Sequence, residues 1–148
     1  MRYVGICVIC LSLGCGGSRG PSKSDIEKIS GGKMKGKEFV PVSGIVKLDG
    51  EPKENVTIYL HGTDSPEQIW ETGTSIGGKY CWAMYTPCDG VVPGEYKVTF
   101  KYLPNKKRDG DGPDELKGKY SDPATSAFSL KVEKGKPQKD IDYELTSP

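Results

Sequence analysis

The residues best suited to covalent chemistry are the five cysteines, which fall into three groups. Cys7 and Cys10 have the C-x-x-C spacing of a redox or metal pair, but their apolar neighbours favour a leader segment instead. Cys15 follows that segment directly. The even pair that remains, Cys81 and Cys88, predicts a disulfide in an exported domain, with two free or buried thiols as the alternative.

Catalysis by a histidine would depend on His61, because it is the only histidine in the chain. The sequence places His61 just after a predicted strand and before a Gly-Thr-Asp turn, which favours a surface or turn residue over a general base. One imidazole and two thiols also make a poor ligand set for a closed zinc site. We therefore expect no catalytic residues, no enzyme activity and no cofactor.

A weak calcium candidate lies in the loop 106–115, which carries Asp109, Asp111 and Asp114. Carboxylates at such spacing can surround Ca²⁺ with oxygen ligands. However, the loop lacks the twelve-residue pattern that ends in a bidentate glutamate, and the three basic residues at 106–108 oppose a cation. A solvated hairpin insertion is therefore the favoured interpretation.

Four aromatic residues could line a glycan-binding face: Tyr59, Trp70, Trp82 and Tyr85. They stand in predicted strands, where alternating aromatic residues more often form core contacts or cross-strand pairs. We therefore keep glycan binding as an alternative to a buried role.

The first fourteen residues have the pattern of a signal peptide. One positive charge precedes an apolar stretch that is too short to cross a bilayer as a helix. The sequence LSLGC at 11–15 resembles a bacterial lipobox, although Ser12 stands where that pattern prefers leucine. The resemblance implies that Cys15 receives fatty acyl chains such as palmitate and becomes the first residue of a lipoprotein. An ordinary secretory leader is the alternative.

We expect residues 15–38 to consist of the lipidated cysteine and a flexible tether. The composition predicts the tether, because the segment is rich in Gly, Ser and Lys and poor in large apolar residues. The anchor would hold the following domain on the extracytoplasmic face of a bacterial membrane. The formal net charge of the whole chain is only +1, which gives no indication of a nucleic-acid partner.

Residues 39–148 predict a single all-β domain. Polar and apolar residues alternate in several short segments, and the chain contains 20 glycines and 11 prolines to supply turns. The predicted inward-facing sets are Val40, Val42, Val46 and Leu48; Val56, Ile58 and Leu60; Tyr96, Val98, Phe100 and Tyr102; Phe128, Leu130 and Val132; and Ile141, Tyr143 and Leu145. Two more strands at 69–75 and 79–85, joined through Gly77 and Gly78, bring the count to about seven. Seven short antiparallel strands favour a two-sheet sandwich.

Four segments of this domain are similar to the carboxypeptidase regulatory-like, or transthyretin-like, domain of bacterial envelope lipoproteins. They are VSGIVKLDGEP at 42–52, TSIGGKY at 74–80, PGEYKV at 93–98 and KYSDPATS at 119–126. The second of them is similar to a hairpin of that family, which implies that the strands at 69–75 and 79–85 are paired. The resemblance implies an immunoglobulin-like or prealbumin-like sandwich, and it implies a non-catalytic structural or binding module at the cell envelope. The partner would be an unknown envelope protein or glycan. A calcium- or glycan-dependent adhesion role is the alternative, and a hydrolase is less favoured.

Overall fold

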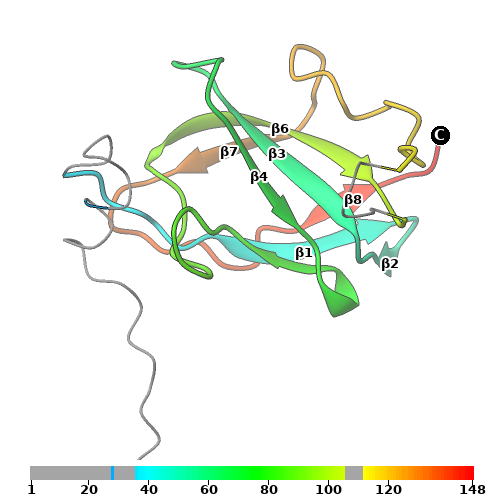
Figure 1. The fold of residues 1–148 in the computed structure, drawn as a ribbon, viewed down its shortest axis with the longest axis horizontal. Coiled ribbons are helices and arrows are strands. Elements are labelled where there is room, and N and C mark those ends of the chain that lie inside the picture. The colour runs from blue at the N-terminus through cyan, green and yellow to red at the C-terminus, as the bar shows by residue number, and fades with distance from the viewer. Residues whose placement is uncertain (1–27, 29–35, 106–111) are drawn as a thin grey trace, which may run out of the picture.

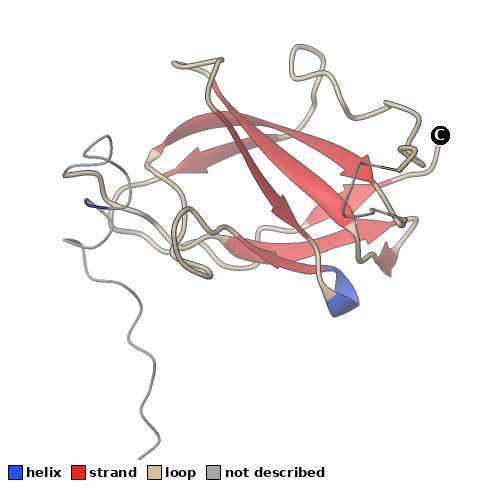
Figure 2. Cartoon of the chain, viewed as in Figure 1, coloured by secondary structure: helices blue, strands red, loops and turns tan. Residues whose placement is uncertain are grey.

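The computed structural model describes residue 28, residues 36–105 and residues 112–148. These residues form two β-sheets that pack face to face as a sandwich (Figure 1). The all-β class predicted from the sequence is therefore confirmed. Figure 2 shows that strands and loops make up nearly all of the described chain, apart from one short 3-10 turn at Ile76–Gly78 and the single helical residue 28.

The larger sheet is regular and antiparallel. Its strand order is β4 (Ile69–Gly73), β3 (Val56–Gly62), β6 (Gly94–Tyr102) and β7 (Ser129–Val132). The pairing of β3 with β6 runs without interruption from Val56 opposite Tyr102 to Gly62 opposite Tyr96. The alternating sequence explains this regularity, because in both strands every second residue is an apolar one that faces the core.

The smaller sheet is mixed and its strands are shorter. Its central strand is β1 (Ser43–Leu48), which pairs antiparallel with β2 (Glu51–Pro52) and with β5 (Lys79–Cys81). The last strand, β8 (Tyr143–Leu145), pairs with β1 in the parallel direction. Asp49 and Gly50 connect β1 to β2 with φ angles of 53° and 85°, as a tight hairpin turn with two left-handed residues requires.

The core lies between the two sheets and contains most of the residues predicted to face inward. Val46, Ile58, Leu60, Phe100 and Leu145 are completely buried. Aromatic rings connect the layers, since the Phe100 ring of β6 lies 5.1 Å from the Tyr143 ring of β8 between centroids. The alternation in the sequence thus predicted correctly which face of each strand is buried.

Two details of the predicted topology are wrong. The segments 69–75 and 79–85 do not form a hairpin: β4 belongs to the larger sheet and β5 to the smaller one. The turn at Ile76–Gly78 carries the chain across from one sheet to the other, and Gly77 and Gly78 both adopt positive φ there. The second of these strands also ends early, because the chain after Cys81 leaves the sheet and forms a loop.

The strand count and direction differ slightly from expectation. The described residues contain eight strands, and the two-residue β2 accounts for the difference from seven. Not every neighbouring pair is antiparallel, because β8 returns beside β1 in the same direction. Parallel neighbours cannot be joined by a tight turn, and here residues 49–142 of the chain lie between β1 and β8.

Several predictions concern residues outside the described part of the chain. These are the signal peptide at 1–14, the acylated Cys15, the tether up to residue 35, and the carboxylates of Asp109 and Asp111. Within the described residues, no helix has the length and apolar character needed to cross a membrane.

Candidate functional site

The most elaborate feature outside the core is the loop that follows β5, which we call the disulfide loop (residues 81–90). Cys81 ends β5, and a disulfide joins it to Cys88 with a Cα–Cα distance of 5.2 Å. This pairing agrees with the disulfide predicted from the two cysteines that remain after Cys7, Cys10 and Cys15 are assigned to the leader and the anchor. The bond closes a small ring beside the edge of the smaller sheet.

A single carboxylate organises the inside of the disulfide loop. Asp89 accepts hydrogen bonds from the backbone N–H groups of Met84, Tyr85 and Thr86, at 2.6, 2.9 and 3.0 Å. These three donors would otherwise lack partners within a tight turn, and an ionised acceptor makes each hydrogen bond stronger. These hydrogen bonds therefore fix the conformation of the segment between the two cysteines.

The disulfide loop is also fixed to the core at its base. Trp82 is buried, and its backbone N–H donates to the carbonyl oxygen of Val42, the residue just before β1, at 3.0 Å. Gly90 has a φ of 110° and packs so tightly that a Cβ atom there would lie 2.1 Å from the carbonyl oxygen of Val40. Only glycine combines this backbone conformation with this closeness. The loop is thus held rigidly where it leaves and rejoins the sandwich.

A groove of about 570 Å³ runs between the disulfide loop and the facing ends of β4 and β5. We call it the edge groove. Its lining residues are Thr72, Gly73, Ser75, Lys79, Tyr80, Cys81, Ala83, Met84, Tyr85, Thr86, Pro87 and Cys88. Lys79 is the only one of these with a charged side chain at neutral pH. Small and apolar groups from the loop form one wall, and the two strand edges form the other.

The two strands that border the edge groove contact each other directly. The Thr72 hydroxyl of β4 donates to the carbonyl oxygen of Cys81 in β5 at 2.9 Å. Farther along, the backbone N–H of Ser75 donates to the carbonyl oxygen of Lys79 at 2.8 Å. These bonds join the two sheets at the base of the groove, so its floor belongs to the folded scaffold.

A second cavity, of about 740 Å³, lies beside the β1–β2 turn and the C-terminus. Its charged lining is mixed in sign, with Asp49, Glu51 and Glu115 near Lys53 and Lys117. It therefore attracts neither cations nor anions strongly.

The C-terminal tail closes one side of this second cavity. Ser147 donates to Asp49 through its hydroxyl at 2.5 Å and through its backbone N–H at 2.9 Å, and these bonds lower the pKa of the Asp49 carboxyl. Lys119 donates to Thr146 and Ser147. The polar groups here fix the tail to the domain. The Ser147 hydroxyl donates to a carboxylate, which is not the histidine base that would activate it as a nucleophile.

His61 differs from the prediction in its position. It lies within β3 and not in the turn after it, and its Nε2 atom is 2.8 Å from the hydroxyl oxygen of Thr99 on β6. Partial burial lowers the pKa of the imidazole, which favours the neutral form at pH 7. The cross-strand contact gives this histidine a structural role on the sheet.

The carboxylate of Asp114 is already used by the protein backbone. It accepts N–H hydrogen bonds from Tyr102, Leu116 and Gly118 at 2.9, 3.0 and 3.0 Å. A calcium ion would compete with these donors for the same oxygens. Among the described residues, no cluster of three or more His, Cys, Asp or Glu side chains could hold a metal ion. The calcium site stays a prediction, since Asp109 and Asp111 lie outside the described chain.

The four aromatic residues do not share one face. Trp82 is buried in the core, and Trp70 packs against the core while remaining partly exposed. Tyr85 belongs to the disulfide loop, where its ring lies 5.6 Å from that of Phe39. Tyr59 lies on the outer surface of β3, with the Lys101 ammonium 5.7 Å from its ring centroid. A continuous aromatic platform for a sugar is therefore not formed by this set.

Sequence reasoning found the disulfide but missed the edge groove. The groove depends on β4 and β5 lying in different sheets, whereas the sequence pattern predicted them as a hairpin. The close spacing of Cys81 and Cys88 was the only signal of a structured loop at this place. Comparison with known proteins adds no assignment, because the chain matches no family model and no curated protein.

Proposed function

We propose that this chain is a lipid-anchored protein of the bacterial cell envelope, whose β-sandwich acts as a non-catalytic structural or binding module. The lipobox-like sequence at 11–15 carries the proposal, because it offers Cys15 for acylation directly after an apolar leader. Two or more acyl chains on one residue would attach the domain stably to a membrane surface.

The disulfide supports an extracytoplasmic location for the domain. Bonds such as that between Cys81 and Cys88 form and persist in oxidising compartments, and they are rare in the cytosol. The four segments similar to the carboxypeptidase regulatory-like domain support the same class, since they occur in order along one small sandwich. The edge groove provides a rigid concave surface for a binding role.

The lipid anchor is tested by a Cys15→Ala variant in a bacterial host. Labelling with a fatty acid analogue should mark the wild-type protein, which should fractionate with membranes. The variant should lose the label and leave the membrane fraction. A Cys10→Ala variant is the matched control, because it changes a leader cysteine and should keep both properties. Label or membrane retention in the Cys15→Ala variant would refute the anchor.

A further inference from the structure

The edge groove lies where both sheets of the sandwich end. β4 is the outermost strand of the order β4-β3-β6-β7, and β5 is the outermost strand on its side of β1. In the described residues, no further strand pairs with the outer edge of β4. An unpaired strand edge presents backbone donors and acceptors that can bind another extended chain.

The register of β4 identifies which backbone groups point outward. Thr74 donates to Val56 and Gly62 donates to Gln68 across the β3–β4 pairing, so the even-numbered residues of β4 bond to β3. The alternate residues, Glu71 and Gly73, therefore direct their N–H and C=O groups away from the sheet. Both residues are exposed, and Gly73 lines the edge groove.

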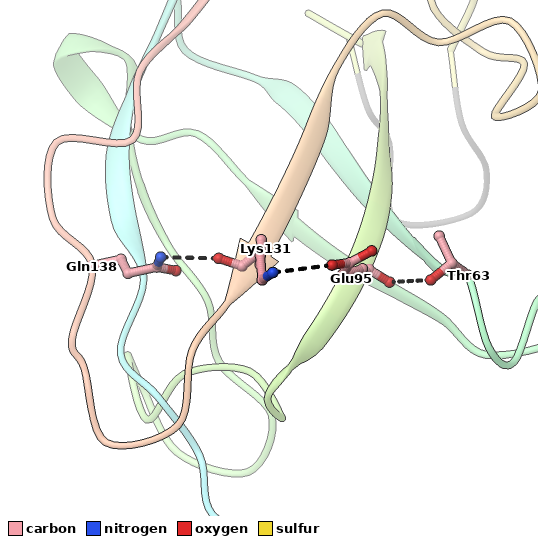
Figure 3. A network of polar contacts seen from close by, with 4 residues as sticks. All are labelled: Thr63, Glu95, Lys131 and Gln138. Atoms are coloured by element: carbon pink, nitrogen blue, oxygen red, sulfur yellow. Dashed lines mark hydrogen bonds and ion pairs between the residues drawn. The ribbon is translucent and has the colours of Figure 1, made fainter.

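The opposite edge of the same sheet is covered. On the outer edge of β7, the carbonyl oxygen of Lys131 accepts a hydrogen bond from the Gln138 side chain at 2.9 Å (Figure 3). Within the sheet, the Lys131 ammonium lies 3.3 Å from Glu95, its partner on β6. Glu95 in turn accepts from Thr63 through its carbonyl oxygen. In the part of the chain that the structure describes, no segment covers the outer edge of β4 in this way. β4 also contains neither proline nor lysine, two residues that commonly protect an edge.

The lining of the edge groove indicates which kind of peptide fits. Lys79 gives it a single positive charge, which complements an acidic side chain or a terminal carboxylate. Ala83, Met84 and Pro87 offer apolar contacts on the side of the disulfide loop. The disulfide and the Asp89 hydrogen bonds hold this wall in place, so little conformational entropy is lost when a peptide binds.

We propose that the edge groove binds an extended peptide of a partner protein, which adds as a strand to β4 and places an acidic group near Lys79. This inference deepens the proposed function, because it names the class of partner that the tethered module binds. The proposed peptide binding depends on the edge of β4 and not on acylation of Cys15.

The test begins with the full chain, purified in detergent micelles and used to select binders from a random heptapeptide display library. Selected peptides should carry an acidic residue. A synthetic copy of one should slow amide hydrogen exchange at Glu71 and Gly73, because their N–H groups become bonded. Binding is then measured by fluorescence polarisation against three variants.

Gly73→Pro removes the outward N–H group and should weaken peptide binding at least tenfold. Gly73→Ala is the matched control: it keeps the N–H, its Cβ meets no atom within 4 Å, and binding should stay within about twofold. Lys79→Glu should weaken binding at least fivefold through charge reversal at an exposed side chain. Because Lys79 is exposed, this variant also tests the groove if Gly73→Pro fails to fold.

Three results would overturn the proposal. The first is that the library yields no binding peptide, and the second is that selected peptides bind both Gly73→Pro and Lys79→Glu as tightly as they bind the wild type. The third is that the wild type forms a dimer in sedimentation experiments and that Gly73→Pro abolishes this dimer. The last result would assign the edge of β4 to a second copy of the chain. None of them affects the acyl labelling of Cys15, so failure here is distinguishable from failure of the lipid anchor.

Discussion

The two sheets of the sandwich differ in how their strands are held. In the larger sheet, β3 and β6 pair over the whole range from Val56 to Gly62, and both strands bury alternate apolar side chains. In the smaller sheet, β1 shares only short stretches with each of three neighbours, and one of the three pairings is parallel.

The smaller sheet compensates for its short pairings with specific local contacts. Gly44 of β1 packs directly against the backbone of Ile141, where a Cβ atom would lie 2.0 Å from the carbonyl oxygen. The Tyr80 hydroxyl donates to that same carbonyl oxygen at 2.7 Å. The disulfide then fixes the end of β5. Both sheets bury apolar side chains, but long regular pairing defines the larger sheet. In the smaller sheet, close backbone contacts and a covalent bond supplement the burial.

The largest effect should follow from removing a buried side chain of the larger sheet. Phe100 of β6 is completely buried and contacts the rings of Tyr120, Phe128 and Tyr143. A Phe100→Ala variant should lose about 3–5 kcal/mol of unfolding free energy in urea titration, because it leaves a cavity in the core. Ser129→Ala, on the exposed face of β7, is the control and should change stability by less than about 0.5 kcal/mol. A loss below about 1 kcal/mol for Phe100→Ala would contradict the assigned role of burial.

The next effect should come from the covalent bond of the smaller sheet. A double variant, Cys81→Ser with Cys88→Ser, should lose about 2.5 kcal/mol, the value that chain-entropy arguments give for a ring of this size. Chemical denaturation with and without reductant measures it. Reductant should destabilise the wild type by a similar amount and leave the double variant unchanged. Equal stability of wild type and variant would show that the disulfide does not stabilise the domain.

The same contrast explains how much of the fold was predictable. Alternation correctly identified the buried faces, for example Val56, Ile58 and Leu60 of β3, because a period of two depends only on local geometry. It could not identify partners, since a half-buried strand has the same pattern whichever sheet it joins. The hairpin expected around Gly77 was wrong for this reason: the turn there connects two sheets instead of two neighbours.

The candidate site was less predictable than the core. The sequence predicted the pairing of Cys81 with Cys88, but the edge groove requires knowledge of which strand edges remain unpaired. His61 shows the same limit: its position before the Gly-Thr-Asp sequence suggested a surface or turn residue, whereas its contact with Thr99 depends on the register of β3 and β6. The His61–Thr99 contact joins residues distant in the sequence. The groove is lined by a single stretch from Thr72 to Cys88, but it forms only because β4 and β5 join different sheets.

A smaller effect should appear at alkaline pH, and it involves the tyrosines of the smaller sheet. Burial raises the pKa of Tyr143 to about 12, and burial also raises the pKa of Tyr80 well above its ordinary value of 10. In the unfolded chain these hydroxyls ionise near pH 10, while the folded protein keeps them neutral. The stabilisation is therefore fully present below pH 10 and is lost as the pH rises from 10 through 12.

For Tyr143 alone this difference amounts to about 1 kcal/mol at pH 11. Urea titrations at pH 9, 10 and 11 should show the decline in the wild type and a shallower one in Tyr143→Phe, which has no hydroxyl to ionise. The decline that remains in this variant should come from Tyr80, whose ring stacks on Tyr143 at 6.0 Å, and from Tyr96 of β6, whose pKa burial also raises. Identical slopes in wild type and variant would mean that Tyr143 is not buried when the domain folds. The description of the smaller sheet as closely packed around Tyr143 would then be wrong.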